Sequence, residues 1–199
     1  NGDADLFVGT YGAVSSAPQA PPVRSDTIFD LASLTKVIAT TPAIMKLIDE
    51  GRLHLLDPVT KWFPEFAAKG RDDMLVLHLV THTSGLGDFS VSSCGTMQGV
   101  VETAATHEPA WPPGTRFKYA DINFILLGEL VRRVSGVELS RYVGDTILLP
   151  LGMTDTSFNP ASGLRNRCAA TLDASNGLLF GTAQDHVARF LGGAAGHAG

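Results

Sequence analysis

The stretch that decides the fold is Phe29-Asp30-Leu31-Ala32-Ser33-Leu34-Thr35-Lys36. Asp30 is a preferred helix N-cap residue, and apolar residues recur from there until Gly51, a residue that commonly ends helices. We therefore predict a helix, which Pro42 should kink or split because proline lacks a backbone N–H. Ser33 and Lys36 are three residues apart, so they lie on one face of that helix.

A hydroxyl and an amine placed together at the start of a helix can perform nucleophilic chemistry. The partial positive charge of a helix N-terminus disfavours an ammonium, and the apolar neighbours of Lys36 disfavour it further by desolvation. A neutral Lys36 could then accept the proton of Ser33, while free N–H groups at the helix start hold an oxyanion. Ser-x-x-Lys alone is a short pattern that also occurs on ordinary surface helices, so the flanking residues must show whether it is a functional motif.

Composition narrows the function classes. The chain has 199 residues, 44% of them hydrophobic, and a net charge of −5, which is typical of one soluble domain or part of a larger one. The acidic balance argues against nucleic-acid partners, and no apolar run is long enough to predict a membrane span. The two cysteines are expected to be free thiols. The start has no Met and no leader, so we expect the true N-terminus to be missing, and the compartment stays open between periplasm or secretion and cytoplasm.

Periodicity predicts a largely helical chain. Further helices are expected at 97–107, at 122–134 with an end near Gly136, and at 138–149. Residues 74–82 fit either a helix or a buried strand. The remaining expectations are a strand at 6–14, a turn and short helix within 57–70, and a loop-rich stretch at 159–186.

The flanks of Ser-x-x-Lys carry a family resemblance. Residues 29–36 resemble the nucleophile segment of serine β-lactamases and penicillin-binding proteins, within the class C β-lactamase and carboxylesterase branch. Three more segments are similar to that branch and come in its order: 78–86 (HLVTHTSGL), 112–128 (PPGTRFKYADINFILLG) and 149–156 (LPLGMTDT). Four ordered motifs are far more specific than any one of them.

The resemblance implies an α+β fold of the β-lactamase/transpeptidase type. In that fold an antiparallel sheet is flanked by helices and carries a mostly helical insertion. Residues 1–50 would supply the N-terminal strands and the nucleophile helix, residues 51–185 the mostly helical region, and residues 186–199 the re-entry into the α/β domain.

The resemblance also implies roles for individual residues. Ser33 would be the acylated nucleophile, Lys36 the base or proton relay beside it, and Tyr119 a phenol that exchanges a proton with Ser33 and the leaving group. The family usually has Asn where this chain has Asp121. An ionised carboxylate only accepts hydrogen bonds. Asp121, a candidate substrate-binding residue, could therefore hold Lys36 charged or select against anionic substrates.

The family's third motif, Lys-Thr-Gly or His-x-Gly, is expected much further along the chain. His197-Ala198-Gly199 has the right letters, so His197 is a candidate substrate-binding residue, but its glycine-rich surroundings resemble a segment midway through these proteins. We therefore expect the C-terminal strands to be absent from this chain. A complementing C-terminal segment or a second chain would supply them, and residues 1–199 alone should be poorly soluble and nearly inactive.

The resemblance implies a serine hydrolase without cofactor or metal, acting through an acyl-enzyme on small ester or amide substrates. A carboxylesterase for small uncharged esters is the leading hypothesis. The alternatives are a β-lactamase or D-Ala-D-Ala carboxypeptidase and, in another class, a catalytically silent penicillin-binding-like protein. His78 and His82, at i and i+4, also fit a zinc site in spacing, but no further ligand pattern accompanies them. No Gly-x-Ser-x-Gly occurs, which argues against an α/β-hydrolase.

Overall fold

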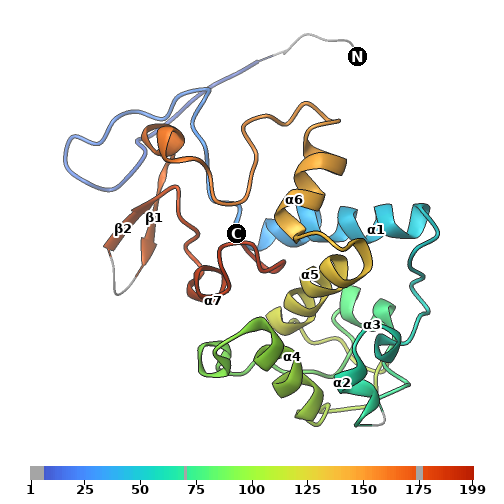
Figure 1. The fold of residues 1–199 in the computed structure, drawn as a ribbon. Helices are drawn as coiled ribbons and strands as arrows, with labels where there is room; N and C mark the ends of the chain where they lie inside the picture. Colours follow the sequence, from blue (N-terminus) through green and yellow to red (C-terminus); the bar gives the residue numbers. More distant parts are fainter. Residues whose placement is uncertain (1–6, 70, 174–176) are drawn as a thin grey trace.

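The computed structural model describes residues 7–69, 71–173 and 177–199. A body of helices α1 to α6 lies on one side of the molecule, and the N-terminal segment lies with the β1–β2 hairpin on the other (Figure 1). Helix α7 and the C-terminus lie between these two parts. Among the described helices, none is long and apolar enough to cross a membrane.

The helix that carries Ser33 has three successive geometries. A 3-10 turn spans Ala32–Leu34, a π-helical turn spans Lys36–Thr40, and α1 spans Thr41–Asp49. The π turn ends at Thr40, two residues before Pro42, which has no N–H to donate to the carbonyl four residues earlier. The predicted split at Pro42 is therefore a change of helix type within one continuous helical run. At the start of the run, the Asp30 carboxylate accepts a hydrogen bond from the Ala32 N–H at 2.7 Å.

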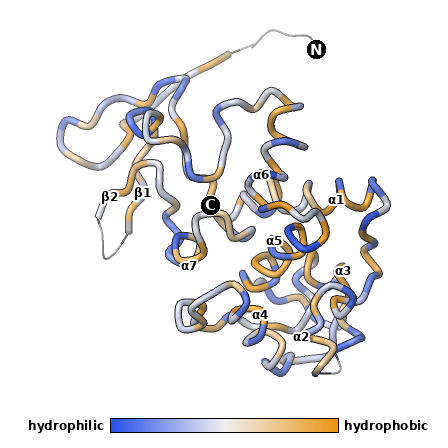
Figure 2. The backbone as a smooth tube through the Cα atoms, viewed as in Figure 1, coloured by the Kyte–Doolittle hydropathy of each residue, from blue (hydrophilic) through white to orange (hydrophobic). Residues whose placement is uncertain are grey.

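Helix α5, Asp121–Ser135, forms the centre of the helical body. Residues 122–131 of this helix are all buried, and most of them are apolar, as burial on every side of a helix requires. It packs against α1, α3, α4 and α6, and Figure 2 shows the hydrophobic colouring of this central region. Gly136 ends the helix in the left-handed conformation at φ 81°, and its N–H bonds to the Arg132 carbonyl. The helix predicted at 122–134 and its end at Gly136 are confirmed.

The remaining helices are short. Residues 74–82, which fitted helix or strand, contain the helix α3, and the described part of 57–70 contains the expected short helix. The predicted helix at 97–107 is confirmed as α4, and 138–149 holds an α turn followed by a π turn. The bounds are Val59–Lys61 (3-10), Pro64–Ala67 (α2), Val76–Val80 (α3), Val91–Cys94 (3-10), Met97–Thr106 (α4), Leu139–Val143 (α6), Gly144–Leu148 (π), Ser162–Arg167 (3-10) and His186–Phe190 (α7).

Strands are where the sequence expectations were wrong. The segment 159–186, expected to be loop-rich and without a predicted strand, contains β1 (Ala170–Asp173) and β2 (Gly177–Phe180), an antiparallel pair with Ala170 opposite Phe180. Each strand has four residues, too few for a period to show in the sequence. Of the strand expected at 6–14, the described residues form only one isolated bridge, Ala13 with Pro22. A strand needs a partner along its length, and this segment meets one only at single residues.

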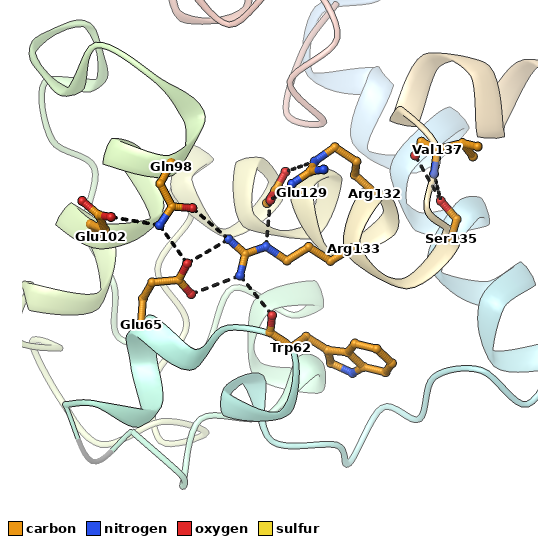
Figure 3. Close-up of polar contacts among 9 residues, drawn as sticks. All are labelled: Trp62, Glu65, Gln98, Glu102, Glu129, Arg132, Arg133, Ser135 and Val137. Carbon is orange, nitrogen blue, oxygen red and sulfur yellow. Dashed lines mark hydrogen bonds and ion pairs between the residues drawn. The ribbon is translucent and has the colours of Figure 1, made fainter.

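A partly buried ion-pair network ties three helices of the body together (Figure 3). Arg133 in α5 bonds Glu129 in the same helix at 2.7 Å, Glu65 in α2 at 3.0 Å and Gln98 in α4 at 3.3 Å. Burial opposes ionisation of Glu129, but hydrogen bonds from Arg132 and Arg133 outweigh it and hold its pKa below the ordinary value. Such a network specifies how the helices pack, because removing one partner would leave a buried charge uncompensated.

Candidate active site

The structure brings Ser33, Lys36 and Tyr119 together at one point. Lys36 Nζ lies 3.1 Å from Ser33 Oγ, within the same helical run. The Tyr119 hydroxyl lies 2.8 Å from the same oxygen, although it comes from the loop that precedes α5. Ser33 is exposed and Tyr119 is 48% exposed, so a substrate carbonyl can approach the serine oxygen from solvent.

Lys36 is only 3% exposed and is surrounded by acceptors. Besides Ser33 Oγ, the His197 carbonyl oxygen lies 2.9 Å and the Asp121 Oδ1 lies 2.7 Å from Nζ. Lys36 Nζ donates hydrogen bonds to Ser33 Oγ and to the His197 carbonyl, and its contact with Asp121 is an ion pair. A carboxylate at contact distance compensates the desolvation of a buried ammonium, which is the role considered above for Asp121.

Asp121 itself occupies the first turn of α5, beside the reacting oxygen atoms. Its side chain is 37% exposed, while its Oδ1 faces Lys36. Negative charge is favoured in the first turn of a helix. The site thus presents a carboxylate to solvent next to Ser33, where a neutral amide would stand in the usual family pattern.

Tyr119 is held by His82, a residue that sequence reasoning considered only as a zinc ligand. The ring centroids of the two side chains are 4.6 Å apart in a stacked arrangement. His82 Nδ1 accepts a hydrogen bond from the Ala120 N–H at 3.2 Å, and the His82 carbonyl accepts one from the Lys118 N–H. Both neighbours of Tyr119 in the chain are thereby tied to one histidine. The signal that could have identified this role is the position of His82 within the HLVTHTSGL segment.

The two histidines of the zinc hypothesis serve separate local roles. His78 Nδ1 accepts a hydrogen bond from the Leu75 N–H at 3.1 Å, and the other nitrogen faces Gly114. His82 is 8% exposed and lies at a φ of 55°, a left-handed conformation that its hydrogen bonds maintain. Within residues 7–69, 71–173 and 177–199, no group of three or more His, Cys, Asp or Glu side chains could hold a metal ion.

The ring of His197 does not face the reacting atoms. It is 1% exposed, and its Nε2 lies 2.9 Å from the Asp185 Oδ1. What His197 supplies to the site is its backbone carbonyl, which contacts Lys36. The letters His-x-Gly therefore do not place a substrate-binding imidazole here, because the side chain is buried among residues of its own chain.

Burial of His82 predicts a pH-dependent stability. Desolvation, together with the charge of Lys36, lowers the pKa of His82 below its ordinary value of 6.5. Between its lowered pKa and 6.5, the folded state therefore binds fewer protons than the unfolded state. The stability that this contributes is complete above pH 6.5 and is lost as the pH falls through the folded pKa.

The expected result is a fall in the free energy of unfolding below pH 6.5, with a His82 share of up to about 1.4 kcal/mol per pH unit. Urea unfolding between pH 5 and 8 measures it in the parent and in His82→Asn. Asparagine tolerates the left-handed conformation and does not titrate. The difference between the parent and His82→Asn in the slope of unfolding free energy against pH gives the contribution of His82 apart from that of the other histidines. Identical slopes would contradict the prediction.

Comparison with known proteins places this fold among the serine β-lactamases and penicillin-binding proteins. A class C β-lactamase superposes with a TM-score of 0.73 at 26% identity, over 85% of this chain and 46% of its own. A β-lactamase/D-alanine carboxypeptidase from Pseudomonas syringae gives the same TM-score at 25% identity, over 85% and 47%.

The family model described as Beta-lactamase matches residues 2–198, and the chain belongs to this family. A protein of Escherichia coli (strain K12) named "Putative D-alanyl-D-alanine carboxypeptidase" is 31% identical over 89% of this chain. The alignment covers 49% of that relative, so this chain spans about half the length of the curated relatives it matches. The family and the α+β fold expected from the four motifs are confirmed.

Proposed function

We propose that this protein is a serine hydrolase that forms an acyl-enzyme on Ser33. The observation that carries the proposal is that the Ser33 oxygen lies between the Lys36 ammonium and the Tyr119 hydroxyl, at 3.1 and 2.8 Å. Both distances are within the range over which protons transfer between positioned groups. Membership in the Beta-lactamase family supports the same reaction class.

The proposed acylation step begins when Ser33 Oγ attacks a substrate carbonyl carbon. The Tyr119 hydroxyl takes up the Ser33 proton as it gives its own proton to the leaving group, whose bond to the carbonyl carbon breaks. Lys36, 4.8 Å from the Tyr119 ring centroid, stabilises negative charge that develops on the two oxygens. The Ser33 N–H lies in the first helical turn, where backbone N–H groups have no intrahelical acceptor, and is a candidate oxyanion donor. Water then hydrolyses the acyl ester.

The proposed substrates are small uncharged esters. Asp121 places a partly exposed carboxylate beside Ser33, and like charges repel, so an anionic acyl group is disfavoured there. A second candidate is amide hydrolysis of the β-lactam or D-alanyl-D-alanine type. It is favoured by the printed names of the Escherichia coli relative and the Pseudomonas syringae structure.

The test is covalent labelling of the full-length protein with a fluorophosphonate, followed by peptide mass spectrometry. The expected result is one adduct, on Ser33. Labelling on another residue would overturn the assignment of the nucleophile. Saturable binding of penicillin or ester without any adduct would instead support the catalytically silent binding protein.

Asp121→Asn is expected to change which substrates are preferred. We expect the ratio of kcat/KM for p-nitrophenyl acetate over that for p-nitrophenyl hemisuccinate to fall about tenfold. Removing one charge a few ångströms away changes the interaction by about 1–1.5 kcal/mol at a partly exposed site. Asp145→Asn, at an exposed carboxylate in the π turn after α6, is the control and should leave the ratio unchanged. An unchanged ratio in Asp121→Asn would show that this carboxylate does not select substrate charge.

A further inference from the structure

Gly196 and His197, in the segment before the C-terminus, direct their backbone carbonyls toward the helical run that carries Ser33. Thr40 Oγ1 donates to the Gly196 carbonyl at 2.7 Å, and Lys36 Nζ donates to the His197 carbonyl at 2.9 Å. Thr40 and Lys36 are one helical turn apart and buried, at 0% and 3% exposure. The position of these carbonyls therefore bears directly on where the Lys36 ammonium lies.

The other side of this segment is pressed against α5. Gly196 has a φ of +95°, and a Cβ atom there would clash with the Phe124 carbonyl and lie 3.0 Å from the Gly128 Cα. Only glycine allows so close an approach of two backbones. The segment consequently has no room to move away from Lys36 in the direction of α5.

Thr35 Oγ1 donates to the Gly199 carbonyl at 3.2 Å, and the side chain of His197 restrains this segment further. Its Nε2 lies 2.9 Å from Asp185 Oδ1, and that same oxygen accepts the Ala188 N–H at 2.7 Å as the N-cap of α7. The hydrogen bond from His197, with that from Ala188, holds the pKa of Asp185 at about 2 despite its burial. One carboxylate thereby joins the start of α7 to the residue whose carbonyl contacts Lys36.

We propose that Asp185 and His197 are a positioning pair that holds the His197 carbonyl against Lys36 and thereby fixes the ammonium relative to Ser33. Neither side chain touches the reacting atoms, so both act through Lys36. This role rests on the proposed function and adds two residues to it. If the carbonyl moves, the ammonium keeps only Ser33 and Asp121 as partners and shifts toward the carboxylate. A misplacement of about 1 Å in a catalytic site can cost about 10²-fold in rate.

The experiment compares His197→Leu with His197→Gln in the full-length protein. Leucine removes the donor to Asp185, whereas glutamine keeps an N–H donor at a similar reach. The control is Thr96→Ala, which removes the N-cap of α4, where Thr96 Oγ1 accepts the Gly99 N–H at 3.1 Å. The measurements are kcat and KM for p-nitrophenyl acetate, the rate of fluorophosphonate labelling on Ser33, and the Tm.

We expect His197→Leu to lower kcat and the labelling rate together by about 10²-fold, with KM changed by no more than about twofold. His197→Gln should restore both rates to within about tenfold of the parent. Thr96→Ala should lower the Tm and leave both rates unchanged, which separates positioning from general loss of stability. Asp185→Asn is the second variant, since it keeps the N-cap and an acceptor and removes only the charge; it should slow labelling to a smaller extent.

Labelling of a folded His197→Leu at the parental rate would overturn the positioning role. Should that variant fail to fold, parental labelling in Asp185→Asn would overturn it equally. If His197→Gln lowered the labelling rate as much as His197→Leu, the positioning role would also be overturned, because restoring the donor would have had no effect. Failure of the parent itself to label on Ser33 would overturn the proposed function and this role with it, a result that the variants cannot mimic.

Discussion

Ser33→Ala is expected to abolish the covalent adduct and to lower kcat by a factor on the order of 10⁴–10⁶. The loss is large because the acyl-enzyme needs an oxygen that can form a bond, and no neighbouring group can replace it in the same place. Lys36 and Tyr119 would remain, but they would have no hydroxyl between them. The residual rate would come from binding and from hydrogen-bond donors that stabilise an oxyanion.

The measurement combines steady-state hydrolysis of p-nitrophenyl acetate with mass spectrometry after fluorophosphonate treatment. Ser93→Ala serves as the control, since Ser93 is an exposed serine in the 3-10 turn Val91–Cys94. It should retain full activity and the adduct. Turnover in Ser33→Ala that stays near the parental rate would mean that another residue is the nucleophile.

The second large effect is expected for the two groups that flank the Ser33 oxygen. Tyr119→Phe and Lys36→Met should each lower kcat by about 10²–10⁴-fold while changing KM far less. Phenylalanine keeps the ring stacked on His82 but removes the hydroxyl 2.8 Å from Ser33. Methionine keeps most of the volume of Lys36 and removes the charge.

The double variant makes the prediction specific. Because the two groups handle one proton and one developing charge, the combined loss should be smaller than the product of the two single losses. Independent contributions would instead multiply, and that result would contradict a joint role. Tyr11→Phe, at a tyrosine that is 77% exposed in the N-terminal segment, is the control for removal of a phenol. Melting curves establish that each variant is folded.

The arrangement around Lys36 also explains why Asp121 matters for more than substrate choice. A buried ammonium is costly unless it is paired, and here the carboxylate at 2.7 Å supplies the pairing. Replacing that carboxylate changes the charge of the site and, at the same time, one of the groups that contact Lys36. The substrate ratio proposed for Asp121→Asn is therefore the informative quantity, since loss of positioning would lower both rates and leave their ratio unchanged.

The sequence by itself determined the local parts of this protein. Ser33 and Lys36 meet because three residues along a helix bring two side chains to one face, and the apolar run of α5 with its end at Gly136 follows from helix period and glycine geometry. The order of the four motifs was enough to predict the family. Each of these features depends on residues that are close together in the chain or on a recognisable pattern.

Only the tertiary structure decided which groups surround Lys36 and which residues support the site. The partners of Lys36 come from the start of α5 and from His197, whose carbonyl belongs to a residue 161 positions away in the sequence. The stacking of His82 on Tyr119 and the pairing of β1 with β2 depend on contacts that the local sequence pattern does not predict. The physical reason is that local propensity acts over a few residues, whereas burial, ion pairing and strand pairing join distant segments once the chain is packed.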